Sequence, residues 1–210
     1  TADFLNSCPT FLAIFLSVAQ PDRIKAGNPQ SANKEANFLL VDDTLIALQQ
    51  LASFNRALYN LRVIGITGSN GKTIVKEWLY QLLVADFNIV RSPKSFNSQI
   101  GVPLSVWQIN EAHTLGIFEA GVSKPNEMNA LAQIIKPNVG ILTNIGEAHA
   151  EGFENRTEKL KEKLKLFADT DLFIYSPTYV NGIKNADLPG KNKFTWSLTD
   201  PADLKITFIE

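Results

Sequence analysis

Apolar and polar positions alternate in blocks along most of this chain. From about residue 61, short apolar runs are separated by longer segments in which apolar residues recur with helical spacing. The expected strands are residues 62–66, 87–90, 114–120, 139–144 and 171–176, and the expected helices are residues 72–84, 125–135 and 157–167. Short apolar strands that alternate with helices predict an α/β fold, a parallel sheet with helices on both faces.

The two ends of the chain differ from this regular middle. Residues 20–37 are polar and contain proline and glycine, so we expect a loop there. Residues 37–41 predict a short buried strand, and Asp42 or Asp43 can cap the helix that follows. Residues 204–210 predict a final strand. The sequence begins without methionine and stops on that strand, so we expect it to be a piece of a longer protein.

Composition narrows the function classes. Lys and Arg total 20 and Asp and Glu total 21, so a net charge of −1 provides no broad basic field for nucleic acid. The apolar run at residues 11–19 is shorter than the roughly 20 residues that a membrane span needs. One cysteine, Cys8, excludes an intrachain disulfide and fits a cytoplasmic location.

The stretch "GITGSNGKT" follows the first expected strand and opens a helix, which is the context of a phosphate-binding loop (P-loop). Ile66 stands where the usual pattern has its first glycine. The glycines allow a tight turn, Lys72 could reach the outer phosphates, and the Thr73 hydroxyl could bind Mg²⁺. A Gly-rich turn with a chance Gly-Lys-Thr is the alternative. The predicted nucleotide-binding residues are Gly68, Ser69, Asn70, Gly71, Lys72 and Thr73.

Candidate polar residues also follow the other expected strands. Glu119 ends an apolar strand, where P-loop proteins often place an acid that holds Mg²⁺, but a capping or salt-bridged glutamate fits the position equally well. Asn97 and Ser98 could contact a substrate or belong to an ordinary capped loop. His149 lies in a loop, where a lone histidine is more often structural or solvated than a ligand.

The helix "TEKLKEKLKLF" carries four lysines interleaved with glutamates. Its periodicity predicts a solvated amphipathic face with the leucines and the phenylalanine buried, and singles out no lysine.

Four blocks, "GITGSNGKT", "NSQIGVPLSV", "FEAGVSKPNEM" and "TNIGEAHAEGF", occur in this order and together resemble the Mur ligases. These are ATP-dependent enzymes that add amino acids to the peptidoglycan precursor. The second block is similar to that of the members that add D-Ala-D-Ala to UDP-N-acetylmuramoyl-tripeptide. The resemblance implies a ligase that forms an amide bond through an acyl phosphate, with ATP, the tripeptide and D-Ala-D-Ala as its partners.

The resemblance also implies roles for individual residues. In the family, the P-loop threonine and the glutamate of the third block hold the Mg²⁺ that bridges the ATP phosphates, and Thr73 and Glu119 match them. A histidine and a lysine carbamylated by CO₂ hold a second Mg²⁺, and His149 and Lys163 match these. The implied catalytic residues are Lys72, His149 and Lys163. The two residues after this lysine are usually Gly-Glu, but here they are Leu-Lys.

Domain organisation follows from the same resemblance. Residues 1–60 would be the end of the N-terminal domain that binds the UDP substrate, together with a linker, and residues 61–210 the central ATP-binding domain, truncated at its C-terminal end. Relatives with similar blocks occur as fusions with alanine racemase, so a pyridoxal-phosphate domain could follow downstream.

Three alternatives to this function remain open to test. The first is another Mur-type or a folylpolyglutamate-type ligase, against which the resemblance of residues 97–104 argues. The second is a nucleotide-binding module without turnover, because these residues alone lack a domain that would exclude water. A GTPase switch is the third, but it needs an Asn-Lys-x-Asp stretch, and neither Asn-Lys pair here has the aspartate.

Overall fold

The computed structural model describes residues 41–146 and 152–207, and its chain divides into two compact units, Thr1–Gln50 and Leu51–Glu210. In the first unit, helix α4 (Thr44–Ala57) begins directly after Asp43. The Asp43 carboxylate accepts the N–H of Ile46 at 2.9 Å, which confirms the predicted cap. The strand expected at residues 37–41 lies, except for Val41, outside the described residues.

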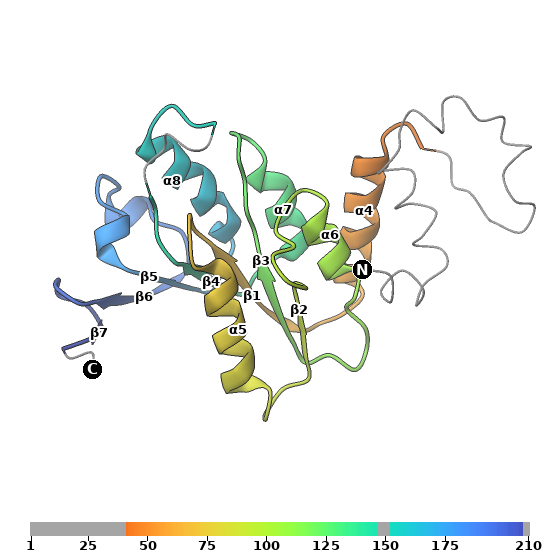
Figure 1. The fold of residues 1–210 in the computed structure, drawn as a ribbon, viewed down its shortest axis with the longest axis horizontal. Coiled ribbons are helices and arrows are strands. Elements are labelled where there is room, and N and C mark those ends of the chain that lie inside the picture. Colours follow the sequence, from red (N-terminus) through yellow and green to blue (C-terminus); the bar gives the residue numbers. More distant parts are fainter. Residues whose placement is uncertain (1–40, 147–151, 208–210) are drawn as a thin grey trace, which may run out of the picture. The chain divides into compact units, whose positions relative to one another are not determined.

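The second unit is built on a parallel seven-stranded sheet with the order β2-β3-β1-β4-β5-β6-β7 (Figure 1). The strands are β1 (Arg62–Thr67), β2 (Ile89–Arg91), β3 (Leu115–Glu119), β4 (Val139–Leu142), β5 (Leu172–Tyr175), β6 (Asn192–Ser197) and β7 (Leu204–Lys205). The five strands of the regular middle are confirmed close to their expected positions. Strand β6 was not predicted, because its sequence "NKFTWS" has no continuous apolar run.

Helices cover both faces of this sheet (Figure 1). They are α5 (Lys72–Leu83), α6 (Gly101–Val106), α7 (Met128–Ile135) and α8 (Arg156–Leu164), with short 3-10 turns η3 (Lys165–Phe167), η4 (Pro177–Tyr179) and η5 (Asn185–Asp187). Side chains of β1 point to both faces of the sheet. Ile66 packs in the apolar cluster that contains Val75 and Leu79 of α5, whereas Val63 packs in the cluster that contains residues of α6, α7 and α8. This is the layered α/β architecture that the sequence predicts.

Helix α7 begins later than expected. The spacing predicts a helix from about residue 125, but residues 123–127 form a turn around the carboxylate of Glu127. That carboxylate accepts the N–H groups of Ser123 and Lys124 at 2.8 and 3.0 Å. These contacts hold the chain in a turn before α7 starts at Met128.

The carboxyl ends of β1, β3 and β4 meet at one edge of the sheet. Ile66 pairs with Glu119 of β3, and Thr67 pairs with Leu142 of β4. The chain runs from β3 on one side of β1 to β4 on the other, so this edge is a topological switch point, where ligands bind in open α/β sheets. Every helix in the two described stretches is too short or too polar to cross a lipid bilayer.

Candidate nucleotide and metal site

The loop between β1 and α5 is held by the segment that follows β4. The main-chain N–H of Ser69 donates to the carbonyl oxygen of Asn144, and that of Asn70 donates to the Asn144 side-chain oxygen, both at 3.0 Å. The Thr143 hydroxyl donates to the carbonyl oxygen of Asn70 at 2.6 Å. The Ser69 and Asn70 amides are thus engaged within the protein. The N–H groups of the first turn of α5 have no partner within the helix and are the ones positioned for a phosphate.

Two glycines allow the backbone conformation of this loop. Gly68 and Gly71 have φ angles of 150° and 79°, in the positive-φ region that residues other than glycine rarely adopt. A Cβ at Gly68 would come within 2.0 Å of the Thr143 hydroxyl oxygen, whereas a Cβ at Gly71 would meet no atom within 4 Å. Gly68 is therefore required both by its backbone and by the close approach of the β4 segment.

We expect Gly68→Ala to lower the free energy of unfolding more than Gly71→Ala does. Both substitutions strain a backbone with positive φ, which costs on the order of 1–3 kcal/mol, but only the first also forces Thr143 away from the loop. Urea unfolding of the two variants measures the difference. Equal losses of stability would show that the contact with Thr143 has no energetic consequence.

Lys72 is the first residue of α5, and its side chain folds back over the loop. Its ammonium group donates to the carbonyl oxygens of Gly68 at 2.9 Å and Ser69 at 3.4 Å. The positive charge therefore lies beside the N-terminus of α5, where the helix dipole also favours an anion. This is the placement that a lysine needs in order to contact bound phosphates.

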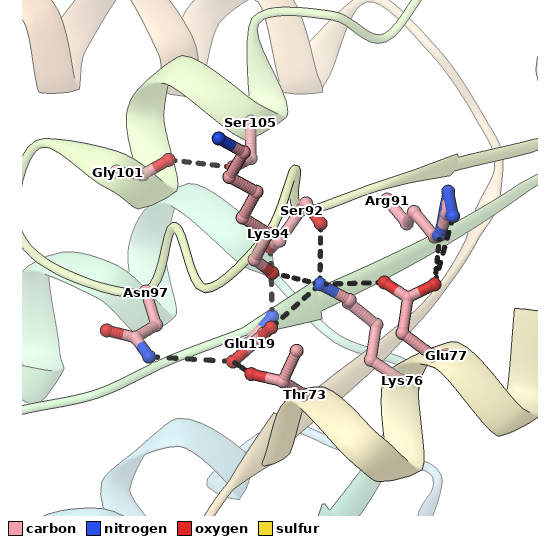
Figure 2. Close-up of polar contacts among 10 residues, drawn as sticks. All are labelled: Thr73, Lys76, Glu77, Arg91, Ser92, Lys94, Asn97, Gly101, Ser105 and Glu119. Carbon is pink, nitrogen blue, oxygen red and sulfur yellow. Dashed lines mark hydrogen bonds and ion pairs between the residues drawn. The ribbon is translucent and has the colours of Figure 1, made fainter.

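Thr73 and Glu119 are brought together from different elements (Figure 2). The Thr73 hydroxyl on α5 donates to Glu119 Oε2 at the end of β3, at 3.0 Å. The Asn97 side-chain amide donates to the same oxygen at 3.5 Å. Glu119 is completely buried. Position alone left open whether this residue is a metal ligand or a salt-bridged glutamate, and the structure shows that it is salt-bridged and also faces Thr73.

These oxygens fit a Mg²⁺ ion. A carboxylate and a hydroxyl are hard ligands, and Mg²⁺ is usually bound by one or two carboxylates together with phosphates and water. Within residues 41–146 and 152–207, no group of three or more His, Cys, Asp or Glu side chains converges on a metal site. A Mg²⁺ ion at Thr73 and Glu119 would take further oxygen ligands from bound phosphates and water, as is usual for this ion.

The salt-bridge partner of Glu119 is Lys76, which the sequence analysis missed. Its ammonium group lies 2.8 Å from Glu119 Oε1, and its side chain is completely buried (Figure 2). Lys76 lies one helical turn after Thr73, so both face β3. The three-residue spacing from Thr73 could have indicated that Lys76 faces the same side of the helix. The sequence alone does not show that this lysine is buried.

The loop after β2 contributes Asn97 and Ser98. The Asn97 carbonyl oxygen accepts the N–H of Gly121 at 2.7 Å, and a Cβ at Gly121 would come within 2.9 Å of the Asn97 side-chain oxygen. Asn97 is thus held against the segment that follows Glu119. The Ser98 hydroxyl accepts the N–H of Gly101, the first residue of α6, at 3.1 Å.

Helix α8 differs from the expected solvated face. Lys159 and Lys163 are 2% and 1% exposed, and Glu162 is also buried, whereas Lys161 is exposed. Lys159 and Lys163 lie four residues apart and share one face of the helix. The expectation that these lysines are solvated was wrong, because the face they share is packed inside the protein. His149, the predicted partner of Lys163, lies outside the described residues.

The Glu162 carboxylate links α8 to α7 and to η3. Its Oε1 atom accepts the N–H of Met128 at 2.9 Å, and its Oε2 atom pairs with the Lys165 ammonium at 2.5 Å. Burial raises the pKa of the Glu162 carboxyl, but the hydrogen bonds from Lys165 and from the backbone outweigh it, so the pKa lies below its ordinary value. The charged form is thus the one that the folded protein stabilises.

This lowered pKa gives a pH-dependent contribution to stability. A depressed carboxyl pKa stabilises the fold above the unfolded-state pKa of about 4.3, and the contribution is lost as the pH falls through the folded-state value. We expect Glu162→Gln to be less stable than the parent protein near neutral pH, and the difference to shrink below about pH 4. Urea unfolding across this range measures it. A difference that stays constant with pH would contradict the assignment of the charge to Glu162.

Comparison with known proteins identifies the family. Residues 66–209 match the family described as the Mur ligase middle domain. The UDP-N-acetylmuramoyl-tripeptide–D-alanyl-D-alanine ligase of Bacillus subtilis is 38% identical over 128 residues, which cover 61% of this chain and 28% of that protein. The same-named ligase of Treponema pallidum is 40% identical over 131 residues, covering 62% and 28%. The chain thus spans less than a third of the length of these relatives.

Solved structures agree with this match. A crystal structure of MurF from Acinetobacter baumannii superimposes with a TM-score of 0.74 and 26% identity, over 85% of this chain and 40% of that one. MurF ligase from Thermotoga maritima, solved in complex with ADP, gives a TM-score of 0.68 and 25% identity, over 80% and 40%. The chain therefore belongs to the Mur ligase family, and residues 66–209 are its middle domain.

Proposed function

We propose that this chain is the nucleotide-binding part of an ATP-dependent ligase that adds D-Ala-D-Ala to UDP-N-acetylmuramoyl-tripeptide in the cytoplasm. The observation that carries the proposal is the contact between Thr73 and Glu119, at 3.0 Å, beside the loop that holds Lys72. A lysine over a helix N-terminus and a hydroxyl–carboxylate pair next to it are the groups that phosphoryl transfer from ATP requires. The names of the curated relatives support the choice of substrates.

The reaction would proceed in two steps. The substrate carboxylate attacks the γ-phosphorus of ATP, the bond to the β,γ-bridging oxygen breaks, and an acyl phosphate and ADP result. The amine of D-Ala-D-Ala then attacks the acyl carbon, loses a proton and expels inorganic phosphate to leave an amide. The residues of this chain would serve chiefly the first step, in which charge accumulates on the transferring phosphoryl group.

Each residue of the site has a part in that step. The N–H groups at the start of α5 would bind the phosphates, and the Lys72 ammonium would offset the charge that develops on them. Thr73 and Glu119 would hold a Mg²⁺ ion, which when bound neutralises phosphate charge and aligns the reacting oxygens. Asn97 lies at the same carboxylate and would orient the acceptor substrate.

We also propose that Lys163, as a carbamate, and His149 would hold a second Mg²⁺ ion. The support is that Lys163 is buried on α8 rather than solvated, and that a carbamate would give it a hard oxygen ligand of the kind Mg²⁺ prefers. Carbon-13 NMR of the full-length protein in labelled bicarbonate tests the modification. A carbamate signal that disappears in Lys163→Ala supports it, and a spectrum that lacks this signal contradicts it.

A panel of amine substrates tests the specificity part of the proposal. ADP release by the full-length protein, with UDP-N-acetylmuramoyl-tripeptide present, is compared for D-Ala-D-Ala, a diamino acid and glutamate. We expect release with D-Ala-D-Ala and little with the others. A preference for a diamino acid or for glutamate would instead indicate a ligase that adds a different residue.

A further inference from the structure

Lys76 is a buried cation that the proposed chemistry does not use. Its ammonium group contacts Glu119 Oε1 at 2.8 Å, Glu77 Oε1 at 3.2 Å and the carbonyl oxygen of Ser92 at 2.7 Å, and it also donates to the carbonyl oxygen of Lys94 (Figure 2). Four acceptors from three elements thus surround an ammonium group that has three protons to donate. A buried lysine with so many partners is held in one position.

The same ammonium group determines which carboxylate oxygen remains for a metal. Lys76 contacts Glu119 Oε1, whereas the Thr73 hydroxyl and the Asn97 amide contact Oε2. Because the carboxylate is anchored through one oxygen, rotation that would turn Oε2 away from Thr73 is restricted. The main-chain N–H of Glu119 also donates to the Ser92 hydroxyl, at 3.2 Å, which holds the end of β3 from a second side.

Lys76 also reaches the loop that carries Asn97. The carbonyl groups of Ser92 and Lys94 lie at the start of that loop, and both accept from the ammonium group. Lys94 has a φ of 49°, which a residue with a side chain adopts only where its surroundings hold it. The loop conformation and the Glu119 orientation are therefore tied to one buried cation on α5, the helix that begins at the phosphate-binding loop.

We propose that Lys76 is a positioning residue that sets Glu119 Oε2 for the Mg²⁺ ion at Thr73 and couples that carboxylate to the Asn97 loop. This inference rests on the proposed function, since it assumes a metal at Thr73 and Glu119. Lys76 acts through Glu119 and touches neither nucleotide nor metal. Partners of metal ligands typically change metal affinity by about 10–100-fold when they are mutated.

The test measures how ADP binding depends on the Mg²⁺ concentration. ADP binding to the full-length protein is followed by calorimetry at increasing Mg²⁺ concentration, for the parent protein, Lys76→Met and Lys76→Arg. We expect Lys76→Met to need about tenfold more Mg²⁺ for half of the gain in ADP affinity, with ADP affinity in the absence of Mg²⁺ unchanged. Arginine keeps the charge but cannot keep all four contacts, so we expect a smaller shift in the same direction.

A neighbouring cation provides the matched control. Arg91 pairs with Glu77 at 3.0 Å (Figure 2). Its guanidinium group also lies over the Tyr80 ring, 3.7 Å from the ring centroid. Arg91→Met removes one positive charge from the same network, and we expect its Mg²⁺ dependence to equal that of the parent. Melting temperatures show whether each variant is folded.

The outcomes separate three cases. If folded Lys76→Met binds ADP with the parent's Mg²⁺ dependence, the ion pair is structural only and the inference is wrong. If Lys76→Met does not fold, Lys76→Arg decides the question by the same measurement. If the parent protein itself binds no ADP, the proposed function fails and the inference falls with it, whereas a shift confined to the Lys76 variants supports the inference.

Discussion

Replacing Lys72 with alanine is expected to lower ATP-dependent turnover of the full-length enzyme about a thousandfold, to near background. The Lys72 ammonium lies over the loop at the start of α5, 2.9 Å from the carbonyl oxygen of Gly68. The loop is held from the β4 side by hydrogen bonds to Asn144, which do not involve Lys72. The variant should therefore fold normally and lose the charge that offsets the transferring phosphoryl group. ADP release in the presence of both substrates measures the effect.

The matched control for this variant is Lys184→Ala. Lys184 is exposed and precedes the short η5 turn, outside the candidate site. We expect that variant to release ADP at the parent rate. If Lys72→Ala also released ADP at the parent rate, residues 65–73 would not be the catalytic loop.

Removing the carboxylate of Glu119 is expected to have the largest effect on stability. Glu119→Ala would leave the Lys76 ammonium buried and without its closest charged partner, and breaking a buried ion pair from one side costs about 3–5 kcal/mol. It would also remove the oxygen that faces Thr73, so the Mg²⁺ dependence of nucleotide binding should be lost. Urea unfolding measures the first effect, and ADP calorimetry with and without Mg²⁺ measures the second.

Glu77→Ala provides the comparison within the same network. Glu77 also contacts Lys76, at 3.2 Å, but its side chain is 37% exposed. Water screens a partly exposed pair, so we expect a loss below about 1 kcal/mol and unchanged Mg²⁺ dependence. If the two substitutions had equal effects on stability, burial of the pair between Glu119 and Lys76 would not be its important property.

Strands buried on both faces were predictable because their sequences are continuously apolar. All five residues of β3, "LGIFE", are buried, and parallel strands of this kind show as apolar runs without alternation. Strand β6 lies between β5 and the short strand β7. It contains polar residues, so its sequence lacks the continuous apolar run that predicts a buried strand. The predicted strands, together with the helix that begins at the end of "GSNGKT", were enough to predict where the site lies. Ligands bind beyond the carboxyl ends of the strands of a parallel sheet, and these ends meet at one edge.

The partners within the site could be predicted only in part. The resemblance matched Thr73 with Glu119, and the structure places them in contact. Lys76 was missed because its burial depends on how α5 packs against β3, which spacing along the chain does not reveal. Burial likewise depends on packing in α8, so the periodicity of that helix did not separate buried Lys163 from exposed Lys161.

The most direct test of the proposed function is ADP release by the full-length protein when ATP, UDP-N-acetylmuramoyl-tripeptide and D-Ala-D-Ala are supplied together and then each is omitted in turn. We expect Mg²⁺-dependent release of one ADP for each amide formed, and little release when either the tripeptide or the dipeptide is absent. ADP release that does not depend on the added substrates, or binding of ATP without any turnover, would contradict it.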